Sequence, residues 1–280
     1  MLSDFERARV LAWSDFRHRY HETALGYLWS VLTPLITLAI LYTVFSVFMN
    51  FQVENYQLFL LLGIVLFNFF SEATREAMHS LSRKRDLVKK VAFPRHVIVL
   101  SSVMTSGAYL LINLGVFMVF MAAFGIFPGI TALYLPVTLL ELFLLVFGLG
   151  YGLSALYVRY GDLGYIWDFV LMALFWVTPI FYDYDLVAPK YVKLYMLNPL
   201  ARIISTSREI LISNHIPLLG GVSGWVHELI TLAICAVVFV LGVWLFRSRQ
   251  ARFAEYLRRR RTALSRTVRP SPRCCLKCLS

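Results

Sequence analysis

Six long apolar stretches constrain this chain more than any other feature of its sequence. Together they take up roughly half of its 280 residues, and they lie near residues 25–50, 56–78, 97–125, 132–158, 164–182 and 227–246. A helix rises about 1.5 Å per residue, so each stretch has about the length needed to cross a hydrocarbon core of about 30 Å. Because 59% of the residues are hydrophobic and only 15% are charged, such stretches would not stay in water. The sequence therefore predicts an all-α integral membrane protein with six transmembrane helices.

The basic residues are sorted between alternate loops. Of the 27 Lys and Arg, four precede the first stretch, seven lie from Arg75 to Arg95, one separates the fourth and fifth stretches, and eleven follow the sixth. Cytoplasmic loops are enriched in Lys and Arg, so both termini and the even-numbered loops are expected in the cytoplasm. The net charge of +11 lies beside membrane spans, where attraction to anionic membrane lipids explains it without a nucleic acid partner.

The segments outside the spans divide the chain into three parts. Residues 1–22 predict an amphipathic helix on the membrane surface, with Trp13 on its aromatic side and Arg17 and Arg19 beside that side. Such a helix either anchors the chain or takes part in the entrance of substrate. Residues 23–247 would form the transmembrane domain, and the basic residues 248–280 a disordered cytoplasmic tail.

The loop between the fifth and sixth stretches is too long for a simple connection. It contains an apolar segment that is interrupted at Asn198-Pro199 and carries Arg202 and Arg208. This pattern predicts two short amphipathic helices that re-enter the outer leaflet around a bend set by the proline. A purely structural cap on the spans is the alternative.

Few residues carry recognisable chemistry. The sequence contains no GxxxxGK[ST] loop, so ATP-driven work would need another polypeptide. Asp183 and Asp185 form a DxD string, which can hold a metal-bound sugar phosphate but is common in loops. Glu141 lies deep in a span, as functional acids do, although protonation or a hydroxyl partner would also explain it. We expect no catalytic, cofactor-binding or metal site on this chain.

Aromatic residues are abundant, with 22 Phe, 15 Tyr and 6 Trp. Tyr42, Phe175 and Trp176 lie deeper in their spans than an interfacial belt requires. Aromatic faces stack on the apolar faces of sugar rings, and this weakly directional contact lets a chain slide. Contact with lipid or ordinary packing is the competing interpretation.

Several strings of the sequence, taken in order, resemble those of a known family. They are RYHETALGYLW (19–29), LVKKVAFPRHV (87–97), VRYGDL (158–163), VTPIFY (177–182) and YMLNPLARII (195–204). Together they are similar to ABC-2 type permeases, and within that group to the bacterial membrane subunits that export O-antigen, capsule or teichoic acid. The resemblance covers about residues 1–250.

The resemblance implies a homodimer in the bacterial inner membrane that exports a lipid-linked polysaccharide such as O-antigen. Each subunit would dock on a separate cytoplasmic ABC ATPase, which would hold the ATP and Mg. The coupling helix would be residues 81–94, with a second contact in the loop around Arg159 and Asp162. The coupling residues within 81–94 would be Arg85, Leu87, Val88, Lys89, Phe93 and Pro94. The string RYGD departs from the family, where an Arg next to the Asp is more usual.

The resemblance also implies a channel lined by the first and fifth spans, and an outer gate over residues 189–215. The channel residues would be Tyr42, Phe175, Trp176, Phe181 and Tyr182. The gate residues would be Tyr195, Asn198, Pro199, Arg202 and Arg208.

Three other functions stay open at this point. An ABC-2 exporter of drugs or lipids would share the fold and differ in substrate. An integral membrane glycosyltransferase would depend on the weak DxD string, and a proton-coupled secondary transporter on Glu141, although the spans reveal no inverted repeat.

Overall fold

The computed structural model describes residues 4–19, 28–49, 55–84, 94–182, 198–214 and 222–249, and within these ranges every regular element is helical. The eight α-helices are α1 (Asp4–Arg19), α2 (Leu28–Tyr42), α3 (Tyr56–Arg83), α5 (Arg95–Ala123), α6 (Leu135–Tyr157), α7 (Leu163–Val177), α9 (Pro199–Leu211) and α10 (Val222–Arg249). A π-helical extension of α2, η1 (Thr43–Phe48), and a 3-10 helix, η2 (Ile130–Tyr134), complete the set. The all-α prediction is confirmed for the described residues.

Within the described residues, five helices are long and apolar enough to cross a membrane: α2 with η1, α3, α5, η2 with α6, and α10. The predicted fifth span, 164–182, differs. Its helix α7 ends at Val177 after 15 residues, a rise of only about 22 Å. Thr178 is extended, as the residue before a proline tends to be, and residues 178–182 continue without helical structure. A sixth complete transmembrane helix is therefore not present in the described structure.

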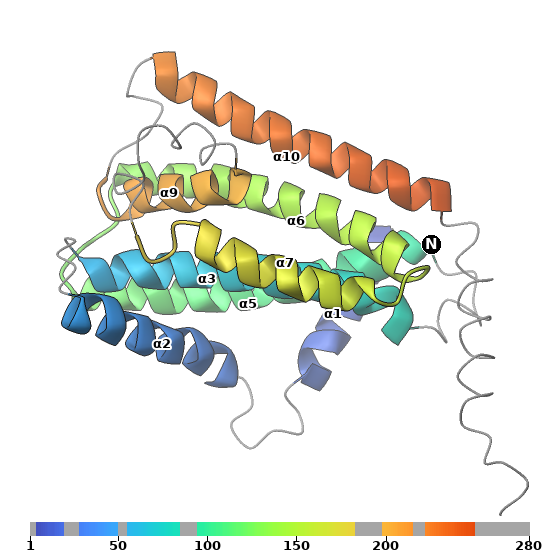
Figure 1. Ribbon diagram of the computed structural model, residues 1–280, viewed down its shortest axis with the longest axis horizontal. Coiled ribbons are helices and arrows are strands. Elements are labelled where there is room, and N and C mark those ends of the chain that lie inside the picture. The colour runs from blue at the N-terminus through green and yellow to red at the C-terminus, as the bar shows by residue number, and fades with distance from the viewer. Residues whose placement is uncertain are drawn as a thin grey trace, which may run out of the picture.

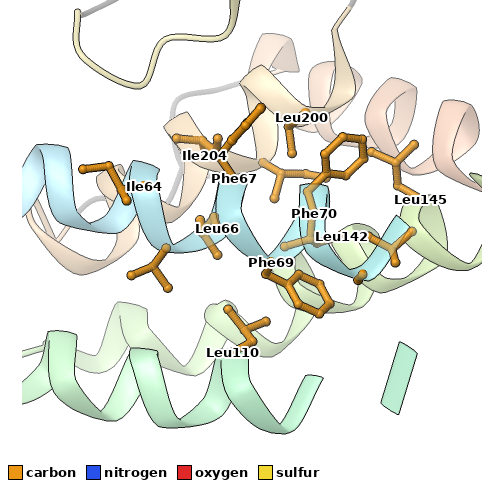
Figure 2. Close-up of a cluster of buried hydrophobic side chains, with 14 of the residues drawn as sticks. Ile64, Leu66, Phe67, Phe69, Phe70, Leu110, Leu142, Leu145, Leu200 and Ile204 are labelled. Carbon is orange, nitrogen blue, oxygen red and sulfur yellow. The ribbon is translucent and has the colours of Figure 1, made fainter. Parts of the chain in front are cut away.

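Helix α3 is the centre of the bundle. Its first half is apolar on every side, which is the pattern of a helix surrounded by other helices, and α5, α6 and α2 pack around it. Figure 2 shows its side chains Ile64 and Phe67 near Ile204 of α9, with Phe69 directed toward Leu110 of α5. By contrast α2 lies at the edge of the bundle and is mostly exposed (Figure 1).

Helix α10 runs along α6 (Figure 1), and two glycines make the contact close. A Cβ atom added to Gly242 of α10 would lie 2.0 Å from the carbonyl oxygen of Gly148. Gly148 and Gly242 therefore admit the close approach of α6 and α10, because backbones can come this near only where both side chains are absent.

Helix α1 packs along the first half of α5. The carboxylate of Asp4 lies 3.1 Å from His96, and the rings of Phe16 and Tyr109 stack at 5.0 Å. Ala12 is buried on this side, whereas Trp13 is 63% exposed. The small residues of α1 thus face the bundle and Trp13 stays available to lipid.

The bundle has two chemically different ends. At one end lie α9 and the starts of α3 and α10; at the other lie the α6–α7 turn and the last turn of α10 (Figure 1). The second end collects the basic termini of the helices, including Arg83 and Arg249. The predicted tail, 248–280, lies outside the described residues beyond Arg249.

Candidate functional site

The aromatic residues predicted to line a channel come together where α7 ends. Phe175, Trp176, Phe181 and Tyr182 form one chain of ring contacts, with centroid distances of 5.8 Å for Phe175–Trp176, 5.3 Å for Trp176–Phe181 and 5.0 Å for Phe181–Tyr182. Phe67 of α3 meets Phe175 edge-on at 5.3 Å. Four residues that the sequence placed in one group therefore form one cluster.

The members of this cluster differ in exposure. Trp176 is 55% exposed, whereas Phe181 is only 8% exposed and is stacked on Phe45 of η1 at 4.9 Å. Tyr42 is connected to the cluster through Tyr56, whose ring centroid lies 6.4 Å away. Trp176 thus presents a ring face to the surroundings, and Phe181 holds the segment after α7 against η1.

Residues 178–182 lie inside the bundle beyond the last helical hydrogen bond of α7, which the N–H of Thr178 donates to Leu174, so other groups must satisfy most of their backbone. The hydroxyl of Tyr56 donates to the carbonyl oxygen of Phe181 at 2.7 Å. The hydroxyl of Tyr182 donates back to that of Val177 at 3.1 Å. These bonds tie the non-helical segment to α3 and to the end of α7.

Arg208 of α9 provides the largest part of this support. Its Nε donates to the carbonyl oxygen of Phe59 at 3.1 Å, its Nη2 to that of Ile180 at 2.8 Å, and its Nη1 to that of Pro179. The guanidinium also lies 3.5 Å from the centre of the Phe59 ring. A Cβ atom on Gly63 would lie 2.4 Å from Nη2, so that glycine makes room for the guanidinium.

Helix α9 begins at Asn198-Pro199, where the sequence predicts a bend between two short helices, and the helix expected before the bend lies outside the described residues. The side chain of Asn198 accepts a hydrogen bond from the backbone N–H of Leu200 at 3.1 Å, and Pro199 occupies the first helical position. Both choices are typical of a helix start. The amide of Asn198 also donates to the Thr178 hydroxyl at 3.4 Å, which links α9 to the end of α7.

Arg202 connects α9 to α6 and α10. Its Nη1 donates to the hydroxyl of Thr231 at 3.0 Å. Burial lowers the pKa of Arg202, while the carboxylates of Glu228 and Glu141 act in the opposite direction. Glu141, the acid noted deep in a span, therefore lies in the electrostatic surroundings of an arginine of α9.

The residues predicted to contact an ATPase are only partly described. Pro94 immediately precedes α5, and Arg159 and Asp162 are exposed in the turn between α6 and α7. Arg85, Leu87, Val88, Lys89 and Phe93 lie outside the described residues, as do Tyr195 of the gate and the DxD string of Asp183 and Asp185. On α1, Arg17 is exposed, and Arg19 is the last helical residue.

Sequence reasoning missed one contact that organises the α3–α7 face. Glu72 and Glu76 lie within one turn of Arg75 on its own helix, but the Nε of Arg75 bonds the carboxylate of Asp168 on α7 at 2.7 Å. Directly beside this pair, the indole N–H of Trp167 donates to the hydroxyl of Thr74 at 3.1 Å. The acid and the indole are adjacent in the sequence, but spacing alone did not identify their partners.

Residues 6–212 match the protein family described as ABC-2 type transporter. The chain is 30% identical over 254 residues to the O-antigen export system permease protein RfbA of Klebsiella pneumoniae, covering 90% of this chain and 95% of the relative. It is 27% identical over 244 residues to the protein of that name from Myxococcus xanthus, covering 86% of this chain and 91% of the relative. It is 23% identical over 239 residues to the polysialic acid transport protein KpsM of Escherichia coli, covering 84% and 90%.

Proposed function

This chain belongs to the ABC-2 type transporter family as a membrane subunit, and we propose that it exports a lipid-linked polysaccharide such as O-antigen across the bacterial inner membrane. It would do so as a homodimer that forms the channel and is driven by a separate cytoplasmic ABC ATPase. Since the chain itself has no nucleotide-binding loop, ATP and Mg would be held by that partner.

The observation that carries the substrate class is the similarity to O-antigen export permeases along nearly the whole chain. The exposed aromatic surface of α7 supports it. Tyr165, Phe169 and Trp176 are 82%, 70% and 55% exposed and recur about once per one or two helical turns. Such a row suits a sliding sugar chain, because stacking tolerates displacement along the ring faces.

The proposed ATPase contact, outer gate and domain roles follow from where these segments lie in the chain and in the bundle. Residues 81–94 and the exposed turn of Arg159 and Asp162 would contact the ATPase on the cytoplasmic side, where both termini would lie. Helix α9, with Arg202 and Arg208 joined to three neighbouring elements, would be part of the outer gate. Residues 1–22, 23–247 and 248–280 would act as interface helix, transmembrane domain and cytoplasmic tail.

Deletion of this chain tests the proposal in the organism that carries it. Surface polysaccharide should disappear and its lipid-linked form should accumulate inside the cell. An unchanged polysaccharide on the deletion strain would favour an exporter of drugs or lipids instead.

The aromatic surface is tested by a matched pair of tryptophans. Trp176→Ala should lower export, whereas Trp244→Ala should not, since Trp244 is a similarly exposed residue of α10. Both variants should reach the membrane and retain the ATPase on purification. Equal export by the two variants would assign Trp176 to contact with lipid.

A further inference from the structure

A cavity of about 380 Å³ lies between α2, α3 and α5. Its walls include Trp29 and Thr33 of α2, Asn68 of α3, and Ser106 and Asn113 of α5. On α3 the lining runs from Val65 to Glu76, and Asn68 is 15 residues from the end of α3 at Arg83, so the cavity reaches about 22 Å into the bundle from that end. Hydrophobic side chains alone would suffice to pack helices at this depth, and a polar cavity here therefore needs another explanation.

The polar groups of the cavity are mainly uncharged hydrogen-bonding groups. Within the described residues, the hydroxyl of Ser106 is buried without a hydrogen-bond partner. Asn113 uses one N–H for the carbonyl oxygen of Tyr109 at 2.9 Å, a bond that does not involve its amide oxygen. Trp29 is 45% exposed and lines the same cavity. Amides and hydroxyls beside an aromatic face are the groups that bind a sugar ring, through its hydroxyls and its apolar face.

The charges of the cavity do not suit an anion. Its charged lining residues are Glu72, Arg75 and Glu76, and the guanidinium of Arg75 is bonded to Asp168 of α7. Pores that conduct anions or phosphates are lined by Arg or Lys. Glu76 is itself paired with Arg83, and the one guanidinium of the described lining is already bonded to an acid, so this lining favours uncharged groups over a phosphate or a sialic acid carboxylate.

We propose that this cavity is a binding subsite for uncharged sugar units, and that the polymer exported by this chain is an uncharged glycan rather than a polyanion. Asn68, Ser106 and Asn113 would bind the hydroxyls, and Trp29 would stack on a ring. Arg75 places the subsite next to the α7 surface, because it lines the cavity and bonds α7 at once. This inference rests on the proposed export of a polysaccharide and adds the charge class of that polysaccharide and the place where it binds.

Two variants test the subsite in the full chain, with its ATPase, in the native host. The Asn68→Leu and Asn113→Leu double variant keeps side-chain volume but removes both amides, and two lost hydrogen bonds should lower export about tenfold. The Asn68→Asp variant keeps a hydrogen-bonding oxygen, adds negative charge and leaves the bond from the Asn113 amide to the Tyr109 carbonyl in place. For an uncharged glycan we expect export within about twofold of the native level, because a carboxylate still accepts from sugar hydroxyls.

The order of these two effects decides the charge class. A polyanion would be exported worst by the aspartate variant, since like charges would face each other in the cavity. That order, or normal export by both variants, would overturn the proposal. If the leucine variant fails to reach the membrane, Trp29→Leu against Trp29→Phe replaces it: Leu should lower export and Phe should preserve it, and equal export would again overturn the subsite.

The polymer itself gives a separate readout. The polysaccharide that disappears on deletion of this chain, freed from its lipid by mild acid hydrolysis, should pass unretained through an anion-exchange column at neutral pH. Retention would overturn the inference while leaving polysaccharide export intact. If deletion removes no polysaccharide at all, the proposed function fails first and this inference falls with it.

Discussion

Replacing Arg208 by Met should loosen the segment that follows α7. The native guanidinium bonds the carbonyl oxygens of Phe59, Pro179 and Ile180 from a position that is only 5% exposed. A Met side chain fills much of the same space next to Gly63 and donates to none of the three. The variant therefore separates the effect of the hydrogen bonds from that of side-chain volume.

The expected magnitude follows from how each carbonyl is otherwise satisfied. Phe59 lies within α3, and its carbonyl keeps its helical hydrogen bond. Pro179 and Ile180 lie outside any helix, so their carbonyls would be left buried without this donor. An unsatisfied buried acceptor costs about 1–3 kcal/mol, so the two together destabilise the segment by about 2–6 kcal/mol.

Hydrogen exchange of the intact purified chain measures this change directly. The lower bound of this destabilisation is about 2 kcal/mol. At about 1.4 kcal/mol per decade, that loss speeds hydrogen exchange of the amides of residues 180–182 by about 30-fold. The exchange rate of Arg208→Lys should fall between those of the native chain and the Met variant. Its ammonium keeps the charge but cannot reach all three oxygens in the geometry of the guanidinium. Exchange within about threefold of native in the Met variant would refute the role given to Arg208.

Three further changes test other parts of the molecule. Gly242→Ala should destabilise the chain, because the added methyl group would lie 2.0 Å from the backbone of α6. The control Gly115→Ala has nothing within 4 Å and should be neutral or stabilising by up to about 1 kcal/mol. Equal thermal unfolding midpoints of the two variants would count against the close α6–α10 contact. Phe93→Ala should reduce recovery of the ATPase on co-purification, since truncating a buried aromatic anchor costs about 2–4 kcal/mol, or about 30- to 800-fold in affinity; undiminished recovery with normal export would remove the docking role. Reporter fusions should read as external at Pro128 and internal at Lys90, and an external signal at Lys90 would reverse the topology.

The helical spans were predictable because hydropathy measures burial in lipid directly. The starts of α3 and α5 fall within two residues of the predicted apolar stretches at 56 and 97. The end of α7 was not predicted, because the apolar run continues through Pro179 to Tyr182. The Thr178-Pro179 pair was the available local signal, since the residue before proline avoids helical conformation.

Contacts between distant helices were less accessible to sequence reasoning. The aromatic channel group could be identified because its members are close in sequence, and four of them do touch. The partner of Arg75 is 93 residues away on α7, and a charge three or four residues distant looked equally suitable. Arg208 was assigned to the gate region, but three carbonyl partners leave no side-chain pattern in a sequence.

The two buried arginines of α9 have a consequence for how the protein is made. A charged residue in the middle of a membrane helix raises the cost of insertion by about 2.5–3.5 kcal/mol, so α9 will not enter the bilayer by itself as it leaves the ribosome. One partner of Arg202, Thr231, belongs to α10, the last described helix to be synthesised. We therefore expect helix α9 to remain at the membrane surface until α10 has been inserted beside α6. On this expectation the end of the bundle that contains α9 closes only after α10 has been inserted, and a chain truncated before α10 should reach the membrane with that end still open.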